Sequence, residues 1–244
     1  MVKEVSDIFL SLVIPAYNEA HRIRHTLESV YEFLSTQDYS YEVILCNDGS
    51  NDSTGTIAQA FLAGKSNSKI LDLTHKGKGA AVKEGMLAAR GQNVFMCDAD
   101  LAMSLEQINL FLDEMSKGFD IAIGSRELMG SHRIEEPKLR YFAGRMFNLI
   151  VKFMAIRKYR DTQCGFKCFS SKSAYKIFSS VKTDGWAFDV EVLLLAGRWG
   201  YSVSEVPIKW HHGTNSKVKF TSAAFEMLRD IFLMRIRLLF SAQN

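Results

Sequence analysis

Two carboxylates stand one residue apart directly after an apolar run of the chain: Asp98 and Asp100 follow residues 93–97. Alternate side chains of an extended chain point the same way, so both carboxylates can face one site. Like charges this close repel each other unless a cation lies between them. Mg²⁺ or Mn²⁺ prefers such oxygen ligands and often shares its coordination shell with substrate phosphates. Taken alone, this D-x-D motif is more typical of a polar turn that closes a strand.

A glycine-lysine loop, residues 76–82 (KGKGAAV), is a second chemical signal. Glycines let backbone N–H groups approach a phosphate, and the N-terminus of the following helix favours an anion. The loop matches neither G-x-x-x-x-G-K-[ST] nor G-x-G-x-x-G, so a P-loop NTPase or a dinucleotide-binding enzyme is not expected. A solvated lysine turn is the alternative interpretation.

The elements that position these residues follow from the apolar runs. Residues 9–16, 41–46, 70–73, 93–97 and 120–124 predict strands, and helical spacing lies between them. Such alternation predicts an α/β fold with a mostly parallel, Rossmann-like sheet flanked by helices, in which ligands bind at the carboxyl ends of strands. Six polar residues come at those ends and are expected to form one site: Glu19, Asp48, Lys78, Asp98, Asp100 and Arg126.

Two later segments combine apolar and basic side chains. Residues 140–160 contain six basic residues and no acidic one, which favours a helix on a membrane surface or against a lipid. A packing helix with a basic outer face is the alternative. Residues 225–240 predict a terminal amphipathic helix that is too charged to span a bilayer and lies on a membrane or covers the sheet. No window reaches 18 apolar residues without a charge, so no transmembrane helix is predicted.

Other segments carry acidic residues near predicted elements. Residues 161–169 form a polar entry to a short strand, and residues 204–210 predict the last strand. A helix opens near residue 185 and contains Asp189 and Glu191. Because a spacing of two does not place both on one helix face, one is expected to be functional and the other a favourable first-turn charge.

Composition limits the classes of function. A net charge of +3 favours anionic partners only weakly and does not indicate nucleic acid. The four cysteines lack paired C-x-x-C spacing, which is typical of reduced, buried thiols in an intracellular protein. The first seven residues carry charges and no apolar stretch, so no signal peptide is predicted.

Eight stretches together resemble the inverting glycosyltransferases of family 2, which have the GT-A fold, and more narrowly the polyprenyl- and dolichyl-phosphate glycosyltransferases. In order they are VIPAYNE (13–19), NDGSNDST (47–54), KGKGAAV (76–82), DADLA (98–102), GSR (124–126), DTQCGFK (161–167), DVE (189–191) and EVPIKW (205–210). The resemblance implies a GT-A domain over residues 1–221, followed by an amphipathic, membrane-associating helix over residues 222–244.

The resemblance also implies a reaction. DADLA and DTQCGFK are similar to the glucosyl branch, although Met103 stands where that branch has threonine. The expected activity is metal-dependent transfer of a hexose, with glucose favoured, from UDP-glucose to a polyprenyl or dolichyl phosphate. Alternatives are mannosyl transfer from GDP-mannose and a family 2 enzyme acting on a saccharide hydroxyl. A nucleotidyltransferase or a non-catalytic nucleotide-sugar-binding protein are rival classes.

Site roles follow from the resemblance, residue by residue. The donor nucleotide sugar is expected to contact Pro15, Ala16, Tyr17, Glu19, Asp48, Lys78, Asp98 and Ala99. Asp98 and Asp100 are the expected ligands of Mg²⁺ or Mn²⁺. The acceptor phosphate is expected to contact Arg126, Arg140, Arg145 and Lys217, with Lys209 a weaker candidate. Catalytic roles are expected for Asp100, Asp189, Asp161 and Arg126, with Gln163 helping to shape the sugar side.

A lipid phosphate is already anionic near neutral pH. It therefore needs positioning and charge screening more than a general base, whereas a hydroxyl acceptor would need Asp189 or Glu191 as the base. A single in-line displacement would invert the anomeric carbon. The expected location is peripheral, on the cytoplasmic face of a membrane, and the sequence leaves open whether the chain forms a homo-oligomer.

Overall fold

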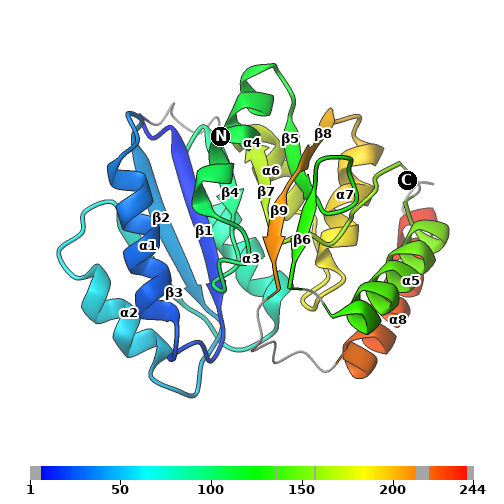
Figure 1. Ribbon diagram of the computed structural model, residues 1–244, viewed down its shortest axis with the longest axis horizontal. Helices are drawn as coiled ribbons and strands as arrows, with labels where there is room; N and C mark the ends of the chain where they lie inside the picture. Colours follow the sequence, from blue (N-terminus) through cyan, green and yellow to red (C-terminus); the bar gives the residue numbers. More distant parts are fainter. Residues whose placement is uncertain (1–6, 136, 157, 213–219, 241–244) are drawn as a thin grey trace.

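The computed structural model describes residues 7–135, 137–156, 158–212 and 220–240. Within two of its helices, the side chains of residues 138–140, 142, 143, 147, 220–225 and 238–240 lie outside this description. Figure 1 shows the chain as a central sheet with helices on both faces.

The central sheet has seven strands in the order β3-β2-β1-β4-β7-β5-β8. Its members are β1 (Leu10–Ala16), β2 (Tyr41–Asn47), β3 (Ser68–Asp72), β4 (Asn93–Met96), β5 (Ile121–Ser125), β7 (Lys167–Ser170) and β8 (Val203–Pro207). All neighbours pair in parallel except β7, which runs antiparallel to both β4 and β5. The predicted α/β fold with a mostly parallel sheet is confirmed.

Helices cover both faces of the sheet because its strands are apolar on both sides. Along β1, Leu12 and Ile14 face one core cluster and Val13 faces the other, as strand alternation requires. The first cluster includes α1 (Ile23–Ser35), α2 (Thr54–Leu62) and α4 (Ile108–Ser116), which follows the short turn η1 (Leu105–Gln107). The second includes α3 (Lys78–Ala88), α6 (Ser171–Phe178) and α7 (Phe188–Arg198).

The segment 204–210, predicted as one strand, is two strands in different sheets. β8 ends at Pro207, and β9 (Lys209–His211) pairs in parallel with β6 (His132–Ile134). Proline has no N–H for a sheet ladder, and the chain changes partners directly after it. The main-chain N–H of His211 donates to the carbonyl of Ala102 at 2.7 Å, so β9 lies against the loop that follows Asp100.

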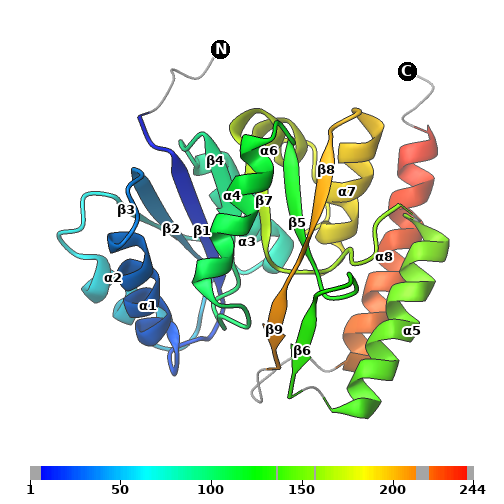
Figure 2. The ribbon, with the colours of Figure 1, turned by 45° about the horizontal axis from the view of Figure 1, so that its top comes forward.

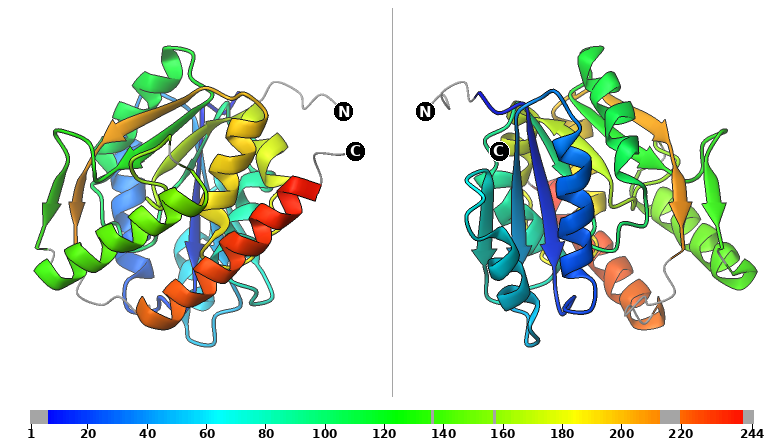
Figure 3. Two further views of the ribbon diagram at one scale, coloured as in Figure 1. Left: turned by 90° about the vertical axis from the view of Figure 1, so that its right-hand side faces the viewer. Right: turned by 60° about the vertical axis from the view of Figure 1, so that its left-hand side comes forward.

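Two long helices, α5 (Lys138–Met154) and α8 (Phe220–Phe240), lie side by side at one end of the molecule (Figures 2 and 3). The basic helix ends at Met154 rather than near residue 160, and the terminal helix begins at Phe220 rather than 225. Ile231 and Met234 are buried in the same core cluster as α7, so α8 packs on the domain. In the part of the chain that the structure describes, no helix is long and apolar enough to cross a bilayer.

Candidate active site

The two aspartates follow the carboxyl end of β4, as predicted. Asp98 and Asp100 lie on a tight loop in which an oxygen of Asp100 accepts the N–H of Ala102 at 3.1 Å. The next residue, Leu101, has a φ of 47°, a left-handed conformation that a branched side chain rarely adopts. Such strain costs of the order of 1 kcal/mol and persists where surrounding contacts enforce it, often at functional sites.

The glycine-lysine loop places its second lysine on the aspartates. The Nζ of Lys78, at the first residue of α3, lies 2.6 Å from an oxygen of Asp98. Burial would lower the pKa of Lys78, but the carboxylates of Asp98 and Asp189 outweigh burial and raise it. Desolvation and the charge of Asp98 both raise the pKa of Asp100. The second carboxylate is therefore disfavoured in its charged form, which makes this position suitable for an additional cation.

A pair of stacked rings lies beside the end of β2. The carboxylate of Asp48 accepts the main-chain N–H groups of Lys76 and Gly77, each at 3.0 Å. It also lies 2.9 Å from Nδ1 of His75, whose ring stacks on Tyr17 with centroids 4.0 Å apart. His75 was missed in the sequence, although it directly precedes the glycine-lysine loop. The arrangement brings the expected nucleoside residues Tyr17 and Asp48 together.

The remaining residues expected to bind the donor lie at the ends of β1 and β4 and in the loops that follow. Pro15 and Ala16 end β1. The N–H of Glu19 donates to the hydroxyl of Thr54 at 2.7 Å, and the carboxylate of Glu19 lies 2.9 Å from Nε of Arg22. The carbonyl of Ala99 accepts the hydroxyl of Thr26 at 2.6 Å.

A forked ion pair joins the end of β5 to the segment before β7. Arg126 donates to the buried carboxylate of Asp161 from Nε at 2.6 Å and from Nη2 at 3.0 Å. Burial would raise the pKa of Asp161, but Arg126 outweighs burial and lowers the pKa to about 2. Asp161 therefore stays ionised near neutral pH and orients the guanidinium of Arg126, which also lies 5.6 Å from the ring of Trp210.

A second buried ion pair was missed in the sequence. Lys167 is fully buried in β7, and its Nζ donates to the carbonyl of Cys164 at 2.6 Å and to the carboxylate of Asp189. Burial raises the pKa of Asp189, and the ammonium groups of Lys167 and Lys78 offset part of that rise. The available signal was a lysine inside the apolar run 166–169, because a buried lysine almost always has an anionic partner.

The structure describes only some of the residues expected to bind the acceptor phosphate. Arg145 on α5 donates to the hydroxyl of Tyr141 at 2.8 Å and lies 3.8 Å from the carboxylate of Glu127, next to Arg126. Lys209 lies on β9, and Gln163 donates its N–H to Asp161 at 3.1 Å. Arg140 belongs to α5 but its side chain is outside the described residues, and Lys217 lies outside them entirely.

Within the described ranges, no group of three or more histidine, cysteine, aspartate or glutamate side chains could hold a metal ion. A cation at Asp98 and Asp100 would thus complete its shell with oxygens from outside this set, such as substrate phosphates. All four cysteines are free and buried, as predicted.

Paired carboxylates and a glycine-lysine loop thus lie at the carboxyl-end edge of a mostly parallel sheet, where α/β proteins bind their ligands. Residues 11–178 match the model of the family described as Glycosyl transferase family 2. The chain belongs to that family, and it is a glycosyltransferase.

Curated relatives are similar over nearly the whole chain. A dolichyl-phosphate beta-glucosyltransferase of Drosophila melanogaster is 36% identical over 256 residues, which cover 99% of this chain and 78% of the relative. The protein of that name from Dictyostelium discoideum is 35% identical, covering 96% of this chain and 76% of its own length. The human protein of that name is 30% identical, with the same two coverages of 96% and 76%.

Solved structures share the fold. Glucosyl-3-phosphoglycerate synthase from Mycobacterium tuberculosis in complex with UDP superposes with a TM-score of 0.69 at 16% identity, covering 93% of this chain and 80% of that one. A complex of the same enzyme with Mn²⁺, UDP-glucose and phosphoglyceric acid gives 0.66 at 15% identity, covering 93% and 79%. At this identity the likeness concerns the fold alone.

Proposed function

We propose that this chain transfers glucose from UDP-glucose to a dolichyl or polyprenyl phosphate, with inversion at the anomeric carbon. The observation that carries the proposal is the pairing of Asp161 and Asp189, the two carboxylates expected on the sugar and acceptor side. Asp161 is bonded to Arg126 and Asp189 to Lys167, so each carboxylate is neutralised by a basic side chain. A hydroxyl acceptor would need Asp189 or Glu191 as the base, and Glu191 is likewise paired, with Arg237, whereas a phosphate acceptor is already ionised.

The donor is held from the β1, β2 and β4 ends. Tyr17 and Asp48 receive the uracil ring, with Asp48 fixed in place by the N–H groups of Lys76 and Gly77. Lys78 turns its ammonium toward the diphosphate, which is the ligand that a lysine at a helix N-terminus suits best. Glucose is favoured by the names of the relatives and by the DADLA stretch.

Asp98 and Asp100 fit a divalent cation such as Mg²⁺ or Mn²⁺. Their oxygens are hard ligands, and burial together with the charge of Asp98 raises the pKa of Asp100, so a cation there would favour its charged form. When bound there, the cation would neutralise the negative charge that develops on the leaving diphosphate. The side chains of the protein would then position the donor and the acceptor relative to each other.

The acceptor phosphate is bound by Arg126, with Arg145, Arg140 and Lys217 as further candidates. Asp161 occupies the Nε–Nη2 fork of Arg126 and fixes the plane of the guanidinium, which contributes its positive charge to the acceptor phosphate. The reaction needs an in-line approach of the acceptor oxygen to the sugar carbon, and a fixed cation supplies that orientation without a proton transfer.

A membrane surface supplies the lipid. Of twelve large apolar side chains exposed in the described part of the chain, seven lie on α5 and α8: Met146, Leu149, Ile150, Phe153, Phe232, Leu233 and Ile236. These two helices lie side by side (Figure 2), and α5 carries only basic charges. Both features suit the cytoplasmic surface of an anionic bilayer, where the enzyme would be peripheral.

The test is nucleotide release by the purified protein with Mn²⁺ or Mg²⁺. UDP-glucose and GDP-mannose are each offered with and without a short polyprenyl phosphate, and Asp100→Ala serves as the inactive control. UDP release that requires both the metal and the lipid phosphate is the expected result. GDP release would overturn the glucose assignment. Release that ignores the lipid would overturn the acceptor and direct attention to a hydroxyl substrate.

A further inference from the structure

The loop between α6 and α7, residues 182–186, covers the start of the glycine-lysine loop. The N–H of Ala80 donates to the carbonyl of Asp184 at 3.1 Å. A Cβ built on Gly79 would lie 2.5 Å from the carbonyl oxygen of Thr183, and one on Gly77 would lie 2.7 Å from that of Asp184. The two glycines are therefore required so that the 182–186 loop can lie directly on the first turn of α3.

The 182–186 loop also contacts Lys78. Trp186, at the end of the 182–186 loop, places its ring 5.3 Å from Nζ of Lys78. The same ammonium is bonded to Asp98 at 2.6 Å. A shift of the loop would change the wall beside Lys78 and the path by which a diphosphate reaches it.

A buried carboxylate on α7 holds the loop. Glu191 is 1% exposed, and its Oε2 accepts the main-chain N–H groups of Lys182 at 3.0 Å and Thr183 at 2.8 Å. Its other oxygen accepts the guanidinium of Arg237 on α8. One carboxylate thus joins the loop to a helix that starts more than thirty residues later in the sequence.

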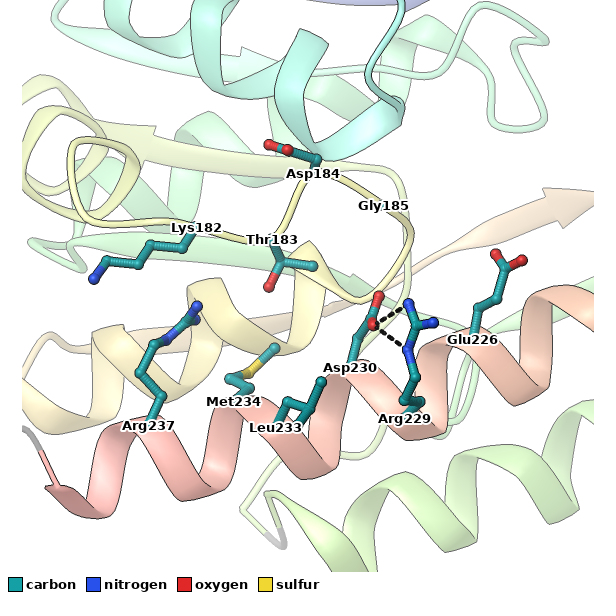
Figure 4. Close-up of a pocket in the computed structure, with 10 residues that line it drawn as sticks. All are labelled: Lys182, Thr183, Asp184, Gly185, Glu226, Arg229, Asp230, Leu233, Met234 and Arg237. Carbon is teal, nitrogen blue, oxygen red and sulfur yellow. Dashed lines mark hydrogen bonds and ion pairs between the residues drawn. The ribbon is translucent and has the colours of Figure 1, made fainter.

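The 182–186 loop is not packed tightly against α8, because a hollow lies between them. A hollow of about 490 Å³ lies between residues 182–185 and α8. Figure 4 draws the residues that line it, with Arg237 at one end. In the same view Arg229 is directed along α8 to Asp230, its partner at 2.9 Å, rather than to the loop. The hollow lies between part of the loop and α8, and the bonds of Glu191 connect the two at the Arg237 end.

We propose that Glu191 is a positioning residue for the donor site and that Arg237 makes α8 a part of that site. Glu191 holds the 182–186 loop over the first turn of α3, and Arg237 fixes the carboxylate of Glu191 in the orientation that the two N–H groups require. The loop in turn holds Lys78 beside Asp98, where the donor diphosphate is expected. The inference rests on the proposed use of a nucleoside diphosphate sugar, and it concerns neither the acceptor nor the sugar.

The test compares Arg237→Met with Arg235→Met on the same helix. Arg237 is partly exposed and Arg235 is exposed, so neither change opens a cavity in the core. Arg237→Met is expected to weaken UDP binding, measured by calorimetry with Mn²⁺ present, by about tenfold, because a displaced loop misplaces Lys78. Arg235→Met is expected to bind UDP as the wild type does. Arg237→Lys should restore part of the affinity.

Steady-state kinetics give the readout that a general loss of structure would not produce. Arg237→Met should raise KM for UDP-glucose and leave KM for the polyprenyl phosphate within about twofold. Glu191→Gln, which keeps an acceptor oxygen but loses the charge for Arg237, should show the same separation. Unchanged UDP affinity in Arg237→Met, or an equal loss for both substrates, would overturn the proposal. UDP binding without any turnover would contradict the proposed function and still decide this inference.

Discussion

The ammonium of Lys78 lies 2.6 Å from the carboxylate of Asp98, which joins the first turn of α3 to the end of β4. The pair places a fixed positive charge beside the two carboxylates of the loop after β4. Lys78 thus contacts Asp98, and from the same position it is expected to contact the donor diphosphate.

Lys78→Met is expected to lower kcat/KM for the nucleotide sugar about 100-fold, equivalent to about 3 kcal/mol of transition-state stabilisation. The loss has two causes, because the diphosphate loses a cation and Asp98 loses its partner. Lys76→Ala is the matched control, since that side chain is exposed and contributes to Asp48 only through its backbone N–H. Equal losses in both variants would contradict a specific role for Lys78.

Gly165→Ala is expected to disable the metal site without unfolding the protein. A Cβ at this position would lie 2.0 Å from Oδ2 of Asp98, so the carboxylate has to move. The affinity for Mn²⁺, followed by titration with the nucleotide present, should fall at least about tenfold. Gly197→Ala on α7 is the control, because its Cβ would meet nothing within 4 Å. That change should leave the affinity for Mn²⁺ as it is.

Asp100→Asn is expected to stabilise the protein while it abolishes turnover. The pKa of Asp100 is raised in the fold, so its charged form is disfavoured at neutral pH and a neutral amide relieves that cost. The melting temperature at pH 7 without metal should rise by roughly 1–2 °C. Asp98→Asn should lower it, because that change leaves Lys78 without its carboxylate. Added Mn²⁺ should stabilise the wild type and neither variant.

Asp161→Asn is expected to destabilise the protein in a pH-dependent way. The pKa of Asp161 is about 2 in the fold, below its ordinary value of 3.8. The ion pair therefore contributes about 2 kcal/mol above pH 4, and this contribution is lost as the pH falls from about 4 to about 2. Urea unfolding at pH 7 and near pH 2.5 measures the difference between wild type and variant, which should shrink at the lower pH. Asp113→Asn, on the exposed face of α4, should show no such trend.

Phe153→Ser is expected to weaken binding to anionic vesicles about tenfold, because a phenylalanine that enters a bilayer contributes about 1.5–3 kcal/mol. Its side chain is 78% exposed, so the stability of the fold should change little. Tyr175→Ser is the control, a 59% exposed aromatic on α6 and away from the pair of long helices. Co-sedimentation with vesicles measures both. Equal binding by the two variants would contradict docking through α5.

The parallel part of the sheet was predictable because its signals are local. Each of the first five strands is an apolar run followed by polar residues, and parallel strands with helical crossovers bring those polar ends to one edge. In the structure Tyr17 and Asp48 both contact His75, and Lys78, three residues further along, contacts Asp98. That these residues form one donor site remains a prediction.

What was missed depends on contacts between distant segments. Neither the antiparallel direction of β7 nor the change of sheet after Pro207 has a local signal, since both are decided by which strands are adjacent. The pairs Lys167–Asp189 and Glu191–Arg237 likewise need burial to be seen, because a charged residue in a sequence is expected at the surface. The expected separation of roles between Asp189 and Glu191 is consistent with their different partners, although the catalytic role remains a prediction.

The antiparallel strand β7 also sets an order of assembly for the chain. β1 to β4 pair among themselves and are made first, whereas β5 and β8 connect to them through residues 167–170. Pairing between strands so distant in sequence is slow, because closing the long loop between them costs entropy before their hydrogen bonds form. The nucleotide half can therefore acquire its shape early in folding. We expect the half that carries Arg126 to take its place only when β7 inserts, so that Arg126 and the nucleotide half come together late in folding.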